Sequence, residues 1–367
     1  MRFEAITKNQ TTIIKGVAIL FIMCHNFLHW IEPVKNSENE FYYWPTHFSS
    51  FVDSLLSYPA EMINILFSYF GHFGVQIFIF ISGYGLAKSF IAKEKKYGVF
   101  IMDKLKRLYS LMITGVIFFF FFKILSASQF LSIAEWKSLG LKFLFVNIFI
   151  PDEIFSCVGP WWFFCLIFQL YLFFPLIYKL VRRFKIKTFL IICLISYIAI
   201  YANSLLGYMP QGTLIMQNAA GHFPEFSLGV YLAIKSDSHI ELKWYWFVIA
   251  LVFFVLGNLY KSFFPLTFLS ITYIIVCGIQ FSRNIKKYIR FIIPVLIQIG
   301  KYSMVLFVIH GFLRDPFVKM AIETHNAAYT ILMLILFLIF VFIVSLAAYQ
   351  VYKRIENAFD SLPPKKK

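Results

Sequence analysis

The stretch TTIIKGVAILFIMCHNFLHW, residues 11–30, decides the fold of this chain. It is mostly apolar, and a helix of about 20 apolar residues is long enough to cross a bilayer. Lys15 lies near its start, and His25 and His29 lie near its end. Ionisable side chains at membrane depth are costly and commonly mark functional sites. The alternative is a packed helix whose histidines bond to neighbouring carbonyl groups.

The rest of the chain continues this apolar pattern. Of its 367 residues, 60% are hydrophobic and only 14% are charged, whereas a soluble domain has about 25% charged residues. No polar block is long enough to form a separate soluble domain of about 100 residues. We therefore expect an all-α, polytopic transmembrane helical bundle that forms one domain over residues 1–367, with a short disordered basic tail at 360–367.

The apolar runs predict about ten membrane spans. They cover residues 11–30, 70–90, 108–126, 160–179, 188–206, 221–234, 243–260, 263–281, 291–311 and 329–352. With a cytoplasmic N-terminus, most of the 34 basic residues fall on the cytoplasmic side, as the positive-inside rule requires. Both termini are then cytoplasmic. The net charge of +16 is distributed over these short loops, so we expect contact with a lipid bilayer and not with nucleic acid.

Two larger loops are predicted on the outer side, at about 31–69 and 127–159. The first loop is rich in acidic and aromatic residues. This composition suits a carbohydrate-binding surface, and it suits equally well helices that lie at the lipid headgroups.

Short motifs follow one another in a definite order along the spans. They are KGVAIL at 15–20 followed by His25, GHFGVQIFIFISGY at 71–84, KLKRLY at 104–109, WWF at 161–163 with Tyr171 and Pro175, FSLG at 226–229, and GKYS at 300–303 followed by His310. In this order the chain resembles, over nearly its whole length, the acyltransferase-3 family of integral membrane O-acyltransferases.

The resemblance implies an enzyme that uses acyl-CoA, most simply acetyl-CoA, as a cytoplasmic donor. The implied acceptor is a hydroxyl group of a cell-surface or lipid-linked glycan or of another molecule, and the implied location is the plasma (inner) membrane. His25 would be catalytic, with His29 as the next candidate, while Lys15, Lys104 and Arg107 would bind the phosphates of the donor. The residues fit these roles, because His25 lies about 15 Å beyond Lys15 along a helix and imidazole can accept a hydroxyl proton at neutral pH.

The chain departs from the family pattern in the first span. The basic residue and the histidine of the family are usually eleven residues apart, but Lys15 and His25 are ten apart and Asn26 takes the usual position. Lysine also replaces the usual arginine at Lys15 and Lys104, which removes bidentate phosphate geometry. This spacing leaves three alternatives. His25 faces inward through a π-bulge or a helix rotation, His29 acts in its place, or the chain is an inactive relative.

The remaining candidates have substrate-binding or structural roles. We assign Ser82, Tyr84, Trp162 and Tyr171 to this group, and Ser82 favours helix packing over nucleophilic catalysis because no G-x-S-x-G elbow surrounds it. His310 either orients the acceptor or bonds to a carbonyl group. His25 and His29 have the spacing of metal ligands but lack a third ligand, so no metal is expected. A transporter of a polar or lipid-linked solute is the rival function, although no internal repeat supports it.

Overall fold

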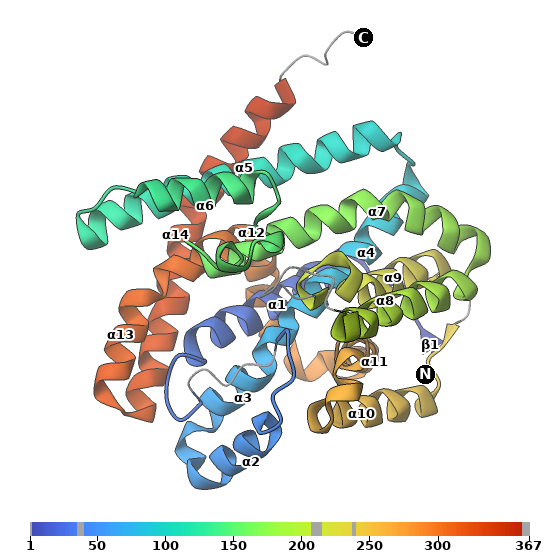
Figure 1. Cartoon of the computed structure of the whole chain (residues 1–367), viewed down its shortest axis with the longest axis horizontal. Helices are drawn as coiled ribbons and strands as arrows, with labels where there is room; N and C mark the ends of the chain where they lie inside the picture. Colours follow the sequence, from blue (N-terminus) through green and yellow to red (C-terminus); the bar gives the residue numbers. More distant parts are fainter. Residues whose placement is uncertain (1, 35–39, 207–214, 237–239, 362–367) are drawn as a thin grey trace. The chain divides into compact units, whose positions relative to one another are not determined.

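The computed structural model describes residues 2–34, 40–206, 215–236 and 240–361 (Figure 1). The predicted tail at 360–367 falls largely outside these residues, while residues 360 and 361 end the last helix. The described chain is almost entirely helical, and a two-residue antiparallel pairing joins β1 (Arg2–Phe3) to β2 (Ile240–Glu241). The predicted all-α fold class is therefore confirmed.

The helices follow one another from the N-terminus to the C-terminus. The α-helices are α1 (Lys8–Leu28), α2 (His47–Ser57), α3 (Met62–Phe70), α4 (Gly74–Ala92), α5 (Tyr97–Ala127), α6 (Ile133–Phe143), α7 (Trp162–Phe184), α8 (Ile186–Leu206), α9 (Ala219–Lys235), α10 (Trp244–Leu259), α11 (Thr267–Ile289), α12 (Ile293–Leu313), α13 (Asp315–Thr324) and α14 (Ala327–Ser361). The 3-10 helices are η1 (Pro59–Glu61), η2 (Gly71–Phe73), η3 (Asn147–Phe149), η4 (Pro151–Glu153), η5 (Gly159–Trp161), η6 (Ile215–Gln217) and η7 (Lys261–Leu266).

Each of the ten predicted spans corresponds to a helix. Within the part of the chain that the structure describes, eight helical segments are long and apolar enough to cross a membrane, namely Lys8–Leu28, Pro59–Ala92, Tyr97–Ser126, Gly159–Phe184, Ile186–Leu206, Lys261–Ser282, Ile293–Leu313 and Ala327–Ser361. The other two predicted spans are the shorter helices α9, with 17 residues, and α10, with 16. Most of α9 is buried. Other parts of the protein therefore surround this helix, whereas a span at the edge of a bundle faces lipid.

Two helices extend well beyond the spans that hydropathy predicts. The predicted third span begins at 108, but α5 begins at Tyr97 and therefore carries the basic motif on its first turns. The predicted last span ends at 352, whereas α14 continues to Ser361. Both extensions are amphipathic or charged, which a hydropathy window does not register.

The chain divides into two compact units. The first unit comprises Met1–Glu94 and Phe173–Lys301, and the second comprises Lys95–Leu172 and Tyr302–Lys367. Both units draw on residues far apart in the sequence, so neither is a separate segment of the chain. The prediction of one domain over residues 1–367 stays a prediction.

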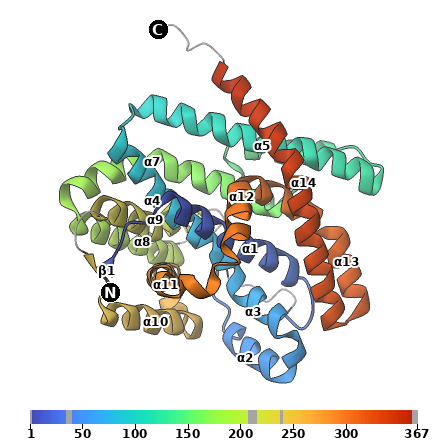
Figure 2. The ribbon, with the colours of Figure 1, turned by 180° about the vertical axis from the view of Figure 1, so that it is seen from behind.

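In the first unit, motif glycines allow helix backbones to touch. A Cβ on Gly83 of α4 would collide with the backbone of Phe226 in α9, and one on Gly229 would collide with the backbone of Phe80. α4 and α9 lie side by side in both views of the ribbon (Figures 1 and 2). Lipid tails are as apolar as the helix side chains, so the hydrophobic effect does not drive helices together in a membrane. Small residues allow close backbone packing, which holds the helices together instead.

The same principle joins α1 to the first half of α12. A Cβ on Gly16 would meet the carbonyl oxygen of Leu296, and a Cβ on Gly300 would meet the carbonyl oxygen of Thr12. These two contacts fix the rotation of α1 about its own axis, because each glycine has to face the partner backbone.

In the second unit, α14 crosses α5 (Figures 1 and 2). Trp161 packs inside this unit, and its indole N–H donates a hydrogen bond of 2.8 Å to the carbonyl of Val308 in α12. Gly115 of α5 leaves the space that the Trp161 ring fills, since a Cβ there would come within 2.7 Å of the ring.

Candidate active site

Three histidines of the first unit form a buried cluster. His25 and His29 come from the end of α1, and His72 comes from η2; each is at most 4% exposed. The rings of His25 and His29 are stacked with centroids 4.7 Å apart, and the His72 ring meets His25 edge-on at 5.5 Å. The structure thus brings together the two predicted catalytic histidines and adds a third imidazole.

The hydrogen bonds of this cluster define which ring nitrogen is basic. Nδ1 of His25 lies 3.1 Å from the carbonyl oxygen of Ser68, and Nδ1 of His29 lies 2.7 Å from the carbonyl oxygen of His25. A carbonyl oxygen only accepts hydrogen bonds, so each Nδ1 carries the proton in the neutral ring. Nε2 is then the nitrogen that can take a proton from a substrate, as in other general bases oriented by a second group.

The backbone of the second motif holds His25 in place. A Cβ on Gly71 would lie 2.7 Å from both the Cβ of His25 and the carbonyl oxygen of Phe21. Gly74 approaches Ala18 and Ile22 one turn earlier in α1. The glycines of this motif therefore place η2 and the start of α4 directly on the face of α1 that carries His25.

The shortened spacing between Lys15 and His25 is accommodated without a π-bulge. α1 is a regular α-helix from Lys8 to Leu28, and His25 is buried while Asn26 is only partly buried. Lys15 is partly buried near the start of the same helix. The rotation of α1 therefore turns His25, and not Asn26, toward the protein interior.

The predicted donor-binding residues of the third motif meet in the second unit. Nζ of Lys104 lies 5.4 Å from the ring centroids of both Phe100 and Tyr171, which is within the range of cation–π contacts. Arg107, one turn further along α5, lies close enough to Tyr171 and to Tyr352 of α14 for electrostatic interactions with both. Lys104, Arg107 and Tyr171 thus lie close together in the second unit.

Sequence reasoning missed the α14 residues of this cluster. Tyr352 donates a hydrogen bond of 2.5 Å to Glu356, and Lys353 forms an ion pair of 2.6 Å with the same carboxylate. A signal existed in the sequence, because charged residues at i and i+3 follow directly after the last apolar run.

The two remaining candidates of the second unit are deeply buried. Trp162 is 5% exposed and contacts Phe163, while His310 is completely buried. Nδ1 of His310 lies 2.8 Å from the carbonyl of Phe307 and 3.1 Å from that of Leu306. Of the two roles predicted for His310, bonding to a carbonyl is therefore present in the structure.

Ser82 and Tyr84 flank the α4–α9 crossing. The hydroxyl of Tyr84, which is 1% exposed, accepts a hydrogen bond of 2.8 Å from the backbone N–H of Ile6. Ser82 is partly buried beside Gly83. The packing role of Ser82 stays a prediction.

A second buried ionisable pair lies in α9. Nδ1 of His222 is 2.7 Å from Oε1 of Glu225, both side chains are fully buried, and His222 stacks on Phe268 with ring centroids 5.2 Å apart. The imidazole thus pairs with one oxygen of the buried Glu225 carboxyl group, which lowers the cost of burying it.

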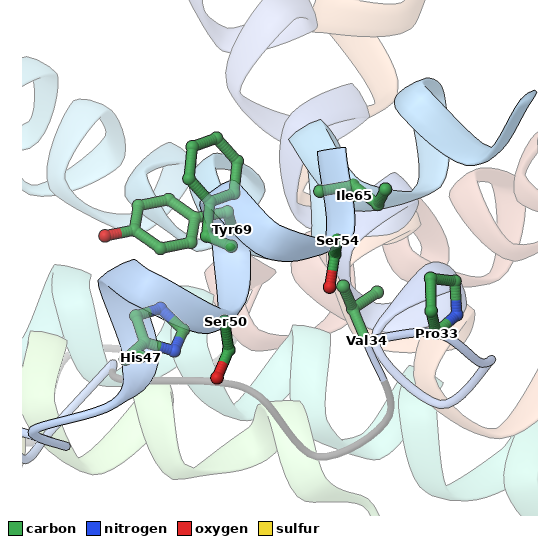
Figure 3. A pocket seen from close by; sticks show the side chains of 8 residues that line it. Pro33, Val34, His47, Ser50, Ser54, Ile65 and Tyr69 are labelled. Carbon is green, nitrogen blue, oxygen red and sulfur yellow. The ribbon is translucent and has the colours of Figure 1, made fainter. Parts of the chain in front are cut away.

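The predicted first outer loop contains a small cavity. Its volume is about 30 Å³, which is the space of about one water molecule. Figure 3 shows the side chains that line it, which are Pro33, Val34, His47, Ser50, Phe51, Ser54, Ile65 and Tyr69. His47 stacks on Tyr69 with ring centroids 4.5 Å apart, and Tyr69 directly follows Ser68, whose carbonyl orients His25. The predicted loop therefore forms helices α2 and α3, and α3 contacts His25.

The predicted second outer loop encloses a buried lysine. Nζ of Lys142 donates hydrogen bonds of 3.2 Å to the carbonyls of Glu153 and Ile154. Burial lowers the pKa of Lys142 from its ordinary value of 10.5 to about 8. The pKa of Glu153 is lowered by a hydrogen bond from Ser138.

The site chemistry is that of general bases and cations. Among the residues that the structure describes, no group of three or more His, Cys, Asp or Glu side chains is placed to hold a metal ion. A buried, oriented imidazole can accept a proton from a hydroxyl group, and an arginine and lysine cluster can bind phosphate.

Comparison with known proteins identifies the family. No curated protein and no solved structure matches the chain. A family model described as an acyltransferase domain matches residues 11–350, which is nearly the whole chain and includes all the motifs above. The chain therefore belongs to the acyltransferase-3 family and is a multi-pass membrane acyltransferase.

Proposed function

We propose that this protein transfers an acetyl group from cytoplasmic acetyl-CoA to a hydroxyl group of a cell-surface or lipid-linked glycan, in the plasma (inner) membrane. The observation that carries the proposal is the orientation of His25. Its Nδ1–H is held by the Ser68 carbonyl, so the basic Nε2 belongs to a fixed and buried ring.

The proposed reaction is a direct acyl transfer. Nε2 of His25 takes the proton of the acceptor hydroxyl while the hydroxyl oxygen bonds to the thioester carbon. The carbon–sulfur bond then breaks, and the sulfur of coenzyme A takes the proton from the His25 imidazolium. The products are an acetyl ester and free coenzyme A, and His25 returns to its neutral form. A positioned general base of this kind contributes about 10²- to 10⁴-fold to the rate.

The cations have separate roles in this proposal. Lys104 and Arg107 bind the donor phosphates, because both are positively charged and meet at Tyr171. Lys15 lies on the same helix as His25, about 15 Å nearer the N-terminal end, and is the third cation assigned to the donor phosphates. His29 holds the ring of His25 in place by stacking against it.

The test is acetyl-CoA binding and hydrolysis by the purified protein in detergent, with wild type beside His25→Ala. We expect binding in both proteins and turnover only in the wild type. Cys24→Ala is the matched control, because Cys24 is the buried neighbour of His25 in α1 and has no role in the reaction. Turnover in both His25→Ala and wild type would transfer the catalytic role to His29. The absence of binding in a correctly folded wild type would contradict the enzyme assignment.

A further inference from the structure

The last turns of α14 contribute polar groups to the basic motif of α5. The family match ends at residue 350, and Tyr352, Lys353 and Glu356 lie just beyond it. The Tyr352 hydroxyl donates a hydrogen bond to Glu356 and lies close enough to Arg107 of α5 for an electrostatic interaction. Lys353 forms an ion pair with the other oxygen of the same carboxylate, at 2.6 Å.

The Glu356 carboxylate is the internal anion of this cluster. Its side chain is 19% exposed, so it is shielded from solvent more than Lys353, which is 43% exposed. It interacts electrostatically with both Lys353 and Arg107. The planar guanidinium of Arg107 and the ammonium of Lys353 are groups that bind a phosphate as readily as they bind a carboxylate.

We propose that Arg107, Tyr352 and Lys353 form one phosphate-binding site, and that Glu356 occupies it as a competing anion until a phosphate-bearing ligand binds. The inference rests on the proposed function, since the phosphates of the acyl-CoA donor are the ligand. It assigns two new binding residues, Tyr352 and Lys353, and it makes Glu356 a residue that weakens donor affinity.

The competition has a physical basis. A phosphate that approaches Arg107 and Lys353 meets the negative charge of Glu356 at short range, and like charges repel strongly where solvent is partly excluded. The carboxylate also holds the hydrogen bond from Tyr352 that a phosphate oxygen would accept. Neutralising Glu356 as Gln therefore favours the ligand by removing this repulsion, while the amide oxygen of Gln still accepts the Tyr352 hydrogen bond.

The experiment measures coenzyme A affinity of the full-length protein in detergent for wild type, Glu356→Gln and Lys353→Met. We expect Glu356→Gln to lower the Kd about three- to tenfold and Lys353→Met to raise it by a similar factor, with both effects reduced at high salt. Lys353→Arg should restore wild-type affinity, because the positive charge is retained.

The matched control is Asp360→Asn, one turn further along α14. Asp360 is 68% exposed and pairs with Lys106 at 3.6 Å, outside the Arg107 cluster. We expect no change in Kd for this variant. Equal shifts in Asp360→Asn and Glu356→Gln would reduce the effect to general surface charge and would overturn the proposal.

Two further arms identify the source of the phosphate. Pantetheine, which lacks phosphate, should bind all variants equally, and any difference among the variants would overturn the proposal. In lipid nanodiscs, phosphatidylglycerol should leave the Glu356→Gln effect in place; if it abolishes the effect by competition, the site binds lipid headgroups and the donor assignment is wrong. The wild type and the Glu356 and Lys353 variants could all bind and hydrolyse acetyl-CoA equally well. That result would refute this inference alone and leave the proposed function intact.

Discussion

The imidazole of His25 and the backbone carbonyl of Ser68 are joined by a hydrogen bond of 3.1 Å between α1 and α3. The donor is Nδ1, and the acceptor belongs to the main chain, so no side-chain substitution at position 68 removes it. The bond links the first span to the helix that leads into η2. The position of the catalytic candidate therefore depends on how closely that segment packs on α1.

Gly71→Ala should reduce acyl transfer more than donor binding. The added Cβ would collide with the Phe21 carbonyl and with the Cβ of His25, so η2 has to move away from α1. We expect turnover to fall at least about tenfold, because small displacements of catalytic groups slow a reaction strongly. The Kd for coenzyme A should be unchanged. Unaltered turnover in a folded Gly71→Ala protein would contradict this account of the site.

Gly83→Ala should destabilise the fold. Its Cβ would meet the backbone of Phe226, which cannot rotate away as a side chain does. The control is Gly85→Ala in the same helix, because a Cβ added at Gly85 would meet no atom of another element within 4 Å. Alanine there gains up to about 1 kcal/mol of helix propensity. Thermal unfolding in detergent should show a lower midpoint for Gly83→Ala than for Gly85→Ala, and equal midpoints would argue against a tight α4–α9 contact.

Tyr84→Phe should lower stability without changing donor affinity. The substitution keeps the ring but leaves the buried N–H of Ile6 without its acceptor, at a cost of about 1–3 kcal/mol. Denaturant unfolding measures the loss, and coenzyme A binding measures the site. A weaker Kd with unchanged stability would instead place Tyr84 in contact with substrate.

Stability should rise with pH above about 8 through Lys142. Its pKa is about 8 in the folded protein and 10.5 ordinarily, so between these values the unfolded chain binds more protons than the folded one. Stability then increases with pH, by at most about 1.4 kcal/mol per pH unit. The expected measurement is the difference in unfolding midpoint between wild type and Lys142→Met from pH 7 to pH 9.

The use of a difference matters because Cys157 opposes this trend. Burial raises the pKa of its thiol to about 11, so above pH 9 the folded state retains a proton that the unfolded state loses. Because the Lys142 charge lowers the pKa of Cys157, Lys142→Met would change this contribution, so both proteins are compared in a Cys157→Ala background. A pH-independent difference would show that Lys142 titrates normally.

Much of the fold was predictable from the sequence. Each predicted span is a helix because long apolar runs have to satisfy their backbone groups internally in lipid. The family was predictable from the order of the motifs. The glycine-containing motifs then proved to be helix contacts, as at Gly83 and Gly300, which a sequence motif alone does not distinguish from a substrate site.

By itself, the sequence determined the helical class, the approximate spans, the family and the candidate histidines. Only the tertiary structure decided that α1 turns His25 inward in place of Asn26, and that the end of α14 meets Arg107 of α5. The reason is physical. Lipid is as apolar as a protein core, so hydropathy assigns no inward face to a membrane helix. Its rotation is set by backbone contacts at glycines such as Gly16 and Gly71, whose partners lie far away in the sequence.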